Sequence, residues 1–422
     1  MEKYSEYKDS GVQWLGEIPS HWSMRRIKWL FKEEDEKNVD LSYQLLSFSR
    51  NKGIIPFSDI NDKAPSASDL SKYKVLHKGQ LLENRMQAWS GMFGCSHIEG
   101  CVSPDYSVFS PYDSSVVVEY YAHLFRTPLY ILQFANASKG IGDGFNRLYT
   151  PQFQKIYAIT PPTKEQNAIV SYLDTKCSRI ETLLANKEKE ISLLQEMKQR
   201  IIADAVTRGL NPNVKFKSTN IPWLQEIPEH WEVKRAKNLF KKEQRPIQDG
   251  DEIVTCFRDG EVTLRSNRRT SGFTEATDYS HYQHICKGDL VIHQMDAFAG
   301  SSGVSDSEGM GTPVLSVCTP KIAEIDNYYY AHILRLMGKN GFILSLYRGI
   351  RERSSDFRFD TFVKQWLPVP PLSEQHAIVS YITERTEKLD SLIGKLNKEI
   401  ECIKEYKQRL ISDVVTGQIN VC

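Results

Sequence analysis

The stretch that decides the fold is WLGEIPSHWSMRRIKWLFK, residues Trp14–Lys32, because it returns as WLQEIPEHWEVKRAKNLFK, residues Trp223–Lys241. Twelve of these nineteen positions are identical, at an offset of 209 residues. The segment PPTKEQNAIVSYL from Pro161 returns as PPLSEQHAIVSYI from Pro370 at the same offset. A long repeat used only twice is not a solenoid, which needs at least three short units to bury its core. The chain is therefore two copies of one unit, and we expect pseudo-two-fold symmetry.

The register of the repeat holds between these anchors without a gap. The sequence YYAH occupies residues 120–123 and again 329–332, and Gly91 matches Gly300. Other positions in between differ, so the two copies have similar edges and divergent interiors.

Each copy begins with a part that is rich in glycine, proline and aromatic residues, at about residues 1–160 and 212–369. Short β-branched or aromatic runs bounded by turn residues predict strands in these parts. Examples are the runs Tyr43–Phe48, Ser114–Val118, Asp251–Phe257 and Asp289–His293. We expect a mixed α/β domain in each copy.

Each copy ends with a helical part, residues 161–211 and 370–422. From Glu165 to Thr207 there is no glycine or proline, and apolar residues recur at heptad spacing. Eight of ten seam positions are apolar in each copy, which is typical of a coiled coil. The apolar seam residues are Leu173, Cys177, Ile180, Leu184, Ile191, Leu194, Ile201 and Ala205, then Ile382, Leu389, Ile393, Leu396, Ile400, Ile403, Leu410 and Val414, with Lys187, Lys198, Thr386 and Lys407 as interruptions.

The two helices are expected to pair with each other in antiparallel orientation, because the second globular part must separate them in the sequence. The alternative is that each helix packs only on its own domain. The fold class that we predict is α+β, with two pseudo-two-fold-related α/β domains joined by an antiparallel coiled coil.

Composition is that of an ordinary globular protein. Of 422 residues, 40% are hydrophobic and 25% are charged, and the formal net charge is +1, which neither indicates nor excludes a nucleic-acid partner. The sequence contains no apolar stretch long enough for a bilayer span and no signal peptide at its start. Eight scattered cysteines without paired spacing are typical of reduced thiols in a cytoplasmic protein.

The common catalytic motifs are missing from the sequence. There is no phosphate-binding loop, and Phe298–Gly303 is better interpreted as a turn. The Pro-Pro pairs at 161 and 370 lack the amide and aromatic partners of an amino-methyltransferase motif and are better interpreted as helix starts. The Pro104-Asp105 pair lacks the acid-x-lysine that a nuclease needs, and the aligned pairs His21/His230 and His123/His332 are interpreted as structural. We therefore expect no catalytic residue and no metal site.

The order WLxEIPxHW, a variable α/β region, then PPxxEQxAIV and a long helix, twice over, resembles the DNA-recognition (specificity) subunit of type I restriction–modification enzymes. The resemblance covers essentially the whole chain. It implies a non-catalytic subunit whose two target-recognition domains, 1–160 and 212–369, each bind one half of a split double-stranded DNA site. It also implies that helical spacers 161–211 and 370–422 act as a ruler and as the docking surface for two methyltransferase subunits.

The resemblance further implies that S-adenosylmethionine, ATP and Mg²⁺ are used by the partner subunits and that this chain has no cofactor. In the holoenzyme those partners, including the restriction and translocase subunits, carry out adenine methylation and ATP-dependent cleavage. The exposed helix positions Glu188, Glu190 and Glu399 are our candidates for partner docking.

Candidate DNA-binding residues are basic and amide side chains in turns that differ between the copies, because two different half-sites demand different side chains. Arginine can pair with guanine and asparagine or glutamine with adenine, while lysine mostly contacts phosphate. The candidates are Arg50, Asn51, Lys52, Arg85, Gln87, Asn146 and Arg147 in the first copy, and Arg258, Arg265, Asn267, Arg268, Arg269, Gln294, Arg351, Arg353 and Arg358 in the second.

Two other classes of protein stay open at this point. One is an autonomous DNA methyltransferase or nuclease with diverged motifs, which binding of S-adenosylmethionine by the purified chain would reveal. The other is a coiled-coil scaffold protein, which would fail to shift DNA fragments in a gel.

Overall fold

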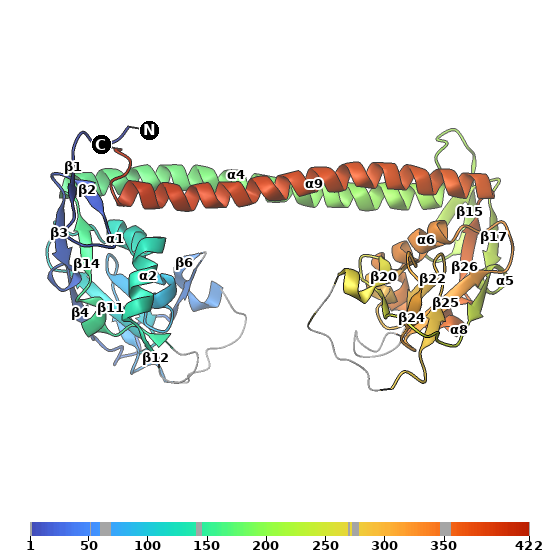
Figure 1. The fold of residues 1–422 in the computed structure, drawn as a ribbon, viewed down its shortest axis with the longest axis horizontal. Helices are drawn as coiled ribbons and strands as arrows, with labels where there is room; N and C mark the ends of the chain where they lie inside the picture. Colours follow the sequence, from blue (N-terminus) through green and yellow to red (C-terminus); the bar gives the residue numbers. More distant parts are fainter. Residues whose placement is uncertain are drawn as a thin grey trace. The chain divides into compact units, whose positions relative to one another are not determined.

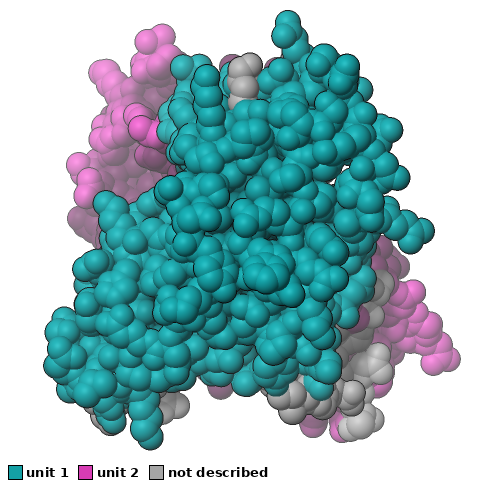
Figure 2. Space-filling model, turned by 90° about the vertical axis from the view of Figure 1, so that its left-hand side faces the viewer, with its two compact units in different colours: residues 1–188, 397–422 teal, residues 189–396 magenta. Residues whose placement is uncertain are grey.

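A computed structural model describes residues 2–50, 52–59, 69–140, 146–268, 271, 278–346 and 356–421. Contacts divide the chain into two compact units, coloured separately in Figure 2: unit 1 comprises residues 1–188 and 397–422, and unit 2 comprises residues 189–396. Each unit therefore combines one globular repeat with the beginning of the long helix that follows it and the end of the other long helix.

The centre of unit 1 is a four-stranded antiparallel sheet in the order β4-β11-β8-β9, flanked by two-stranded pairs and short helices (Figure 1). In chain order its strands are β1 Tyr7–Asp9, β2 Glu17–Pro19, β3 Ser23–Arg26, β4 Phe31–Glu34, β5 Leu46–Ser49, β6 Gly53–Pro56, β7 Lys74–Leu76, β8 Leu81–Asn84, β9 Phe93–Cys95, β10 Gly100–Val102, β11 Tyr106–Pro111, β12 Lys139–Gly140, β13 Asn146–Arg147 and β14 Tyr157–Thr160. Its short helices are η1 Ile27–Trp29, η2 Phe57–Asp59, η3 Ala88–Ser90, α1 Val118–Leu124, α2 Pro128–Ala137 and α3 Thr150–Phe153.

Unit 2 has the matching sheet in the order β18-β25-β22-β23. In chain order its strands are β15 Phe216–Ile221, β16 Leu224–Pro228, β17 Glu232–Arg235, β18 Phe240–Glu243, β19 Val254–Cys256, β20 Val262–Leu264, β21 Gln283–Ile285, β22 Leu290–His293, β23 Ser302–Val304, β24 Gly309–Gly311, β25 Leu315–Pro320 and β26 Trp366–Val369. Its short helices are α5 Ala236–Leu239, η4 Arg265–Asn267, η5 Ala297–Ala299, α6 Asn327–Lys339, α7 Phe342–Ser345 and α8 Phe359–Phe362.

The offset of 209 residues carries over from sequence to structure. The strands β3, β4, β8, β9, β11 and β14 begin 209 residues before β17, β18, β22, β23, β25 and β26. The repeat therefore keeps the positions of these six strands, as the gapless alignment predicts, whereas the hairpins β5–β6 and β19–β20 pair in different registers.

One expected strand is wrong. Residues Ser114–Val117 form no strand, and Val118 opens helix α1 instead. The β-branched run there is buried because it packs against the core as the chain enters the helix, with Val116 5% and Val118 4% exposed. The other three runs each contain a strand: β5, β19 and β22.

Each unit has a main core built around a buried tryptophan and a pair of tyrosines that the repeat places equivalently. Trp22, Tyr120 and Tyr121 are fully buried in unit 1. Trp231, Tyr329 and Tyr330 are fully buried in unit 2. Burying such large side chains supplies much of the hydrophobic stabilisation, about 25 cal/mol for each Å² of apolar surface. This accounts for the identity of these three residues in the two copies.

The two long helices are α4 Thr163–Arg208 and α9 Leu372–Val415, and they lie side by side in Figure 1. Within unit 1, Lys407 pairs with Glu181 and Lys187 pairs with Glu399, so residue numbers rise along one helix as they fall along the other. Within unit 2, Lys198 pairs with Asp390. The helices are therefore antiparallel, and all of the predicted seam positions, including the four interruptions, are buried or half-buried.

The Glu-Gln of each PPxxEQ motif fastens the start of a long helix to its domain. In unit 1, Glu165 receives hydrogen bonds from Trp22 Nε1 at 2.9 Å and Tyr4 Oη at 3.1 Å, and lies 2.7 Å from His21 Nε2. In unit 2, Glu374 makes the equivalent contacts with Trp231 at 3.0 Å and His230 at 2.8 Å. The histidines of the WLxEIPxHW stretches, which we interpret as structural, thus contact the glutamate at the start of each long helix.

The neighbouring glutamine completes this attachment. Gln166 accepts a hydrogen bond from Val117 N at 2.9 Å and donates to the carbonyls of Ser115 and Pro161. Gln375 repeats the pattern with Asp326 N and the carbonyls of Glu324 and Pro370. The helices begin at Thr163 and Leu372, directly after the Pro-Pro pairs, as expected for helix starts.

The end of each long helix is held by the opposite repeat. In unit 1, Tyr120 Oη of the first repeat donates to the carbonyl of Val415, in the last turn of α9, at 2.8 Å. In unit 2, Tyr329 Oη of the second repeat donates to the carbonyl of Val206 in α4, also at 2.8 Å. Each domain is therefore fixed to both helices, and the reading in which each helix packs only on its own domain is wrong.

No helix among the described residues is long and apolar enough to cross a membrane. Seven cysteines within the described ranges, all except Cys422, are free thiols.

Candidate nucleic-acid interface

Most candidate DNA-binding residues of the first copy gather around the turn between β8 and β9. Gly91 ends that turn with φ of 82°, and a side chain there would approach Ile131 Cδ1 to 2.8 Å. Gly300 occupies the same position in unit 2 with φ of 98°. Glycine is needed because the left-handed conformation is costly for other residues. The two units thus present the same turn with different side chains.

Arg50 lies beside this turn. Its guanidinium donates to Ser90 Oγ at 2.7 Å and to the Ser90 carbonyl at 3.2 Å, while Arg126 donates to the Arg50 carbonyl at 3.0 Å. Arg50 remains exposed, as do Lys52 and Gln87. Trp89 on the same turn is 42% exposed, although it is a large apolar side chain. Exposed cationic, amide and aromatic groups are the kinds of side chain that contact phosphates and bases.

Arg85 and Arg147 have a different role in the same cluster. Arg85 donates to the carbonyls of Pro104 and Asp105, and its own carbonyl accepts from Leu148 N at 3.0 Å. Arg147 Nη2 lies 3.6 Å from Asp105 Oδ1. These two arginines therefore hold three loops together, and both are only half-buried.

The equivalent loops of unit 2 meet in the same way. Gln294 N donates to the Val314 carbonyl at 2.9 Å, and Phe357 N donates to the Gln294 carbonyl at 2.8 Å. Gln294, Val314 and Phe357 stand 209 residues after Arg85, Asp105 and Leu148. The bond from Phe357 N to the Gln294 carbonyl thus repeats the bond from Leu148 N to the Arg85 carbonyl, whereas Val314 is bound by the Gln294 backbone and Asp105 by the Arg85 side chain.

The basic residues of the second cluster are paired with acids. Arg258 lies 2.9 Å from Asp296, and Arg268 lies 2.7 Å from Asp259 and 2.8 Å from Glu261. Hydrogen bonding to Asp259 raises the pKa of Arg268, whose guanidinium also lies 4.3 Å from the centre of the Phe257 ring. Arg258 is nevertheless 69% exposed and can exchange its surface partner for phosphate at little cost.

The remaining candidates lie near these loops or outside the described residues. Arg358 is 70% exposed and lies 2.5 Å from Asp356. Arg265 opens the short helix η4, and Asn267 ends it. Asn146 is exposed in β13. Asn51, Arg269, Arg351 and Arg353 lie outside the described residues.

Sequence reasoning missed one equivalent pair beneath both clusters. Arg126 and Arg335 follow the YYAH repeat at the same distance, and burial lowers the pKa of each. Arg126 supports the Arg50 loop, while Arg335 Nε is buried with no hydrogen-bond partner among the described residues, and its side chain lies under Gly260. Extending the aligned YYAH by three residues would have shown an arginine in both copies.

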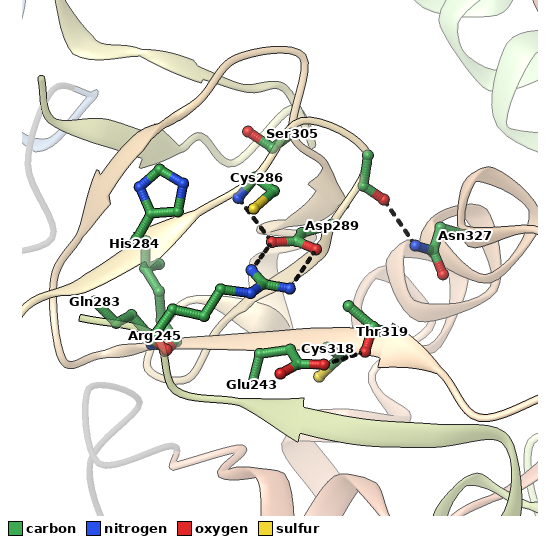
Figure 3. A network of polar contacts seen from close by, with 12 residues as sticks. Glu243, Arg245, Gln283, His284, Cys286, Asp289, Ser305, Cys318, Thr319 and Asn327 are labelled. Atoms are coloured by element: carbon green, nitrogen blue, oxygen red, sulfur yellow. Dashed lines mark hydrogen bonds and ion pairs between the residues drawn. The ribbon is translucent and has the colours of Figure 1, made fainter. Parts of the chain in front are cut away.

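A polar network in unit 2 fixes the start of β22, the strand that leads into the second turn (Figure 3). Arg245 contacts both carboxylate oxygens of Asp289, at 2.5 and 3.2 Å, and Asp289 also accepts from Cys286 N at 2.8 Å. Asp289 is 4% exposed. In unit 1 the equivalent acceptor is the side-chain oxygen of Gln80, which accepts a hydrogen bond from His77 N at 2.7 Å. The same backbone N–H is therefore bound by an ion-paired carboxylate in unit 2 and by a neutral amide in unit 1.

The outward sides of the long helices also carry equivalent residues in both units. Leu183 is 46% and Tyr406 is 50% exposed in unit 1, on the helix segments that the Glu181–Lys407 ion pair joins. Leu392 is 41% and Met197 is 53% exposed in unit 2, on the helix segments that the Asp390–Lys198 pair joins. Leu392 and Tyr406 stand 209 residues after Leu183 and Met197. We call these the two helix patches.

The predicted docking residues differ in their surroundings. Glu188 and Glu190 are exposed on α4. Glu399 is 56% exposed but forms the ion pair with Lys187 across the seam, so it is already engaged within unit 1.

Both the sequence and the fold of this chain are similar to those of known proteins. Residues 228–402 match the family model described as the type I restriction modification DNA specificity domain. The chain is similar to the specificity subunit of the type I restriction enzyme EcoBI from Escherichia coli, with 22% identity over 278 residues, 61% of this chain and 57% of that protein. It is also similar to the MjaVIII specificity subunit from Methanocaldococcus jannaschii, with 23% identity over 293 residues, 66% of each chain. The chain thus spans less than two thirds of these relatives.

Solved structures show the same fold. One such chain comes from a study of the complex assembly and conformational transition of the type I R-M system. It superposes with a TM-score of 0.68 at 14% identity, covering 95% of this chain and 99% of that one. The HsdS subunit from Thermoanaerobacter tengcongensis superposes with a TM-score of 0.52 at 14% identity, covering 95% and 98%. The predicted fold class is confirmed, and the chain resembles the specificity subunits of type I restriction–modification enzymes.

Proposed function

We propose that this chain is the DNA-recognition subunit of a type I restriction–modification enzyme and has no catalytic activity of its own. Its two globular domains would each bind one half of a bipartite double-stranded site. One observation carries the proposal: the turn 84–92 of the first domain and its equivalent 293–301 in the second keep the same backbone hydrogen bonds but carry different basic, amide and aromatic side chains. A scaffold protein has no need for such a difference.

The long helices would supply both the spacing and the docking surface. The helix patches are equivalent between units, which suits two copies of one partner, here two methyltransferase subunits. Methyl transfer from S-adenosylmethionine and ATP- and Mg²⁺-dependent cleavage would belong to the methyltransferase and restriction/translocase partners in the cytoplasm.

The experiment that tests the proposal is methylation mapping. The chain is expressed with the methyltransferase subunits of its system, and the modified sequence is determined across the host genome. Replacing Lys52 and Gln87 by alanine should relax or abolish only one half of the methylated site, and Arg258→Ala should affect only the other half. An effect of either variant on both halves would contradict separate recognition by the two domains.

A binding measurement separates this function from an autonomous methyltransferase. The purified chain should bind no S-adenosylmethionine in calorimetry, whereas the complex with its partners should bind it. Saturable binding by the chain alone would identify a cofactor site within it.

A further inference from the structure

Although the sequence led us to expect no metal site, three potential metal ligands from separate parts of the first domain meet near its surface. Cys95 is the last residue of β9, His97 follows two residues later, and Glu119 lies in the first turn of α1. One potential ligand atom from each lies within 4.8 Å of the other two. Cys95 and Glu119 are half-buried and His97 is exposed, so an ion could enter from the side of His97.

We propose that Cys95, His97 and Glu119 bind a divalent transition-metal ion of the Zn²⁺ type in the first domain only. A thiolate, an imidazole and a carboxylate are three of the usual zinc ligands, at about 2.3, 2.0–2.1 and 2.0–2.2 Å from the ion. Ligand atoms around one such ion lie roughly 3–4 Å apart, so the observed spacing needs only small side-chain rotations. Three protein ligands leave a fourth position for water.

The charges of the ligand set also suit a cation. A divalent ion between Cys95 and Glu119 would offset one thiolate and one carboxylate charge, and binding would release the thiol proton.

The second domain provides an internal comparison. Val304, Asp306 and Tyr328 stand where the first domain has Cys95, His97 and Glu119. Those residues offer neither a thiol nor an imidazole. The backbone is the same in both copies, because β9 and β23 begin 209 residues apart. The ligand set is therefore not a requirement of the fold.

The metal would act as a structural link. β9 follows directly on the turn that carries Gln87 and Trp89, and α1 carries Tyr120, which binds the end of α9. An ion held by β9 and α1 would tie the candidate recognition turn to the helices. Because the ion binds only the folded domain, it should raise that domain's thermal stability. This inference does not depend on the proposed function.

Metal titration of the purified full chain tests the site. After chelator treatment, Co²⁺ should bind with one equivalent per chain and produce a thiolate-to-metal charge-transfer band in the near ultraviolet. Zn²⁺ should displace Co²⁺ and raise the melting temperature. Cys95→Ser should abolish the band, and Glu119→Gln and His97→Ala should each weaken binding at least tenfold.

Cys402→Ser is the matched control, because Cys402 is an exposed thiol on α9 of the same unit, and it should leave binding unchanged. Circular dichroism in chelator establishes that each variant is folded, and His97→Ala at an exposed position keeps the test valid if Cys95→Ser is unstable. Absence of saturable binding, a band that survives Cys95→Ser, or binding that His97→Ala leaves unchanged would overturn the proposal.

Discussion

Glu83 is a carboxyl side chain in the main core of unit 1. It lies in β8 opposite Ser107 of β11 and is 0% exposed, and neither carboxylate oxygen has a hydrogen-bond partner among the described residues. Burial therefore raises its pKa well above the ordinary value. In the second copy the equivalent residue is Ile292, which is fully buried. The first domain thus has a carboxyl group at a position where the second domain has an apolar side chain.

We predict that Glu83→Gln stabilises unit 1 and that the gain grows with pH. Because the folded pKa is raised, the stability of the parent is highest below the unfolded pKa, about 4.3, and falls as pH rises through the folded pKa. At pH values above both pKa values, each unit by which the folded pKa exceeds the unfolded pKa lowers the free energy of unfolding by roughly 1.4 kcal/mol. Urea unfolding of both proteins between pH 4.5 and 8.5 measures this. The exposed Glu188→Gln is the control, and a gain that does not depend on pH would contradict the assignment.

The ion pair between the buried Asp289 and the half-buried Arg245 of unit 2 gives a second prediction at this scale. Asp289→Ala leaves Arg245 without its partner and Cys286 N without its acceptor, so it should lower the free energy of unfolding by about 2 kcal/mol. Asp296→Ala removes the partner of the exposed Arg258 and should cost under about 1 kcal/mol. Chemical unfolding compares the two. Equal losses would mean that Arg245 finds another partner or water.

Residue roles were predictable where the repeat supplied a comparison. The histidines His21 and His230 are interpreted as structural because both copies carry them, and each contacts the glutamate, Glu165 or Glu374, at the start of a long helix. The surroundings of single arginines were not predictable. Nothing in the sequence shows that Arg85 holds two carbonyls while Arg50 lies exposed, because those partners come from loops far away in the chain.

At the scale of elements, heptad spacing predicted both long helices and their seam. The lysine interruptions could be placed in the seam, but their partners depend on the register between the helices, which spacing within one helix does not determine. Lys198–Asp390 and Lys407–Glu181 are repeat-equivalent pairs, whereas Lys187–Glu399 has Leu396 and Glu190 at the equivalent positions. The globular elements were harder, since Ser114–Val118 has strand-like residues but packs at a helix entrance.

The helix patches predict a stepwise loss of partners. Leu183→Glu should release one of two methyltransferase subunits, and Leu183→Glu with Leu392→Glu should release both, because each patch would bind one copy. The fold should persist, since exposed substitutions usually change stability by under about 0.5 kcal/mol. Native mass spectrometry of the co-expressed complex counts the subunits.

Charge reversal at Glu188, an exposed position on α4, is the companion measurement, and it is cleaner than reversal at Glu399, which would also break the Lys187 ion pair. A complex that keeps both subunits with both leucines replaced would place docking elsewhere.

At the scale of the whole molecule, the two units differ in how the chain builds them. Unit 2 is one continuous segment, whereas unit 1 combines residues 1–188 with 397–422. The two pieces of unit 1 meet where Asn420 N donates to the Glu2 carbonyl at 2.9 Å and Tyr7 Oη donates to the Gly417 carbonyl at 2.9 Å. In the repeat, Asn211 is equivalent to both Glu2 and Asn420. The continuous loop around Asn211 in unit 2 therefore corresponds to the place in unit 1 where Glu2 and Asn420 meet.

This equivalence predicts that the chain tolerates circular permutation. Joining residue 420 to residue 2 through a short linker and opening the chain between 211 and 212 would make unit 1 continuous and unit 2 divided. Residues 210–213 are exposed, and exposed loop backbone is where new ends are tolerated. The permuted protein should keep its circular dichroism spectrum and, with its partners, the methylated sequence. Opening between 188 and 189 instead cuts α4 in mid-helix and should lower stability by several kcal/mol, because it exposes helix ends inside the seam. If the two permutants behaved alike, the junction at Glu2 and Asn420 would not be the structural equivalent of the loop at Asn211.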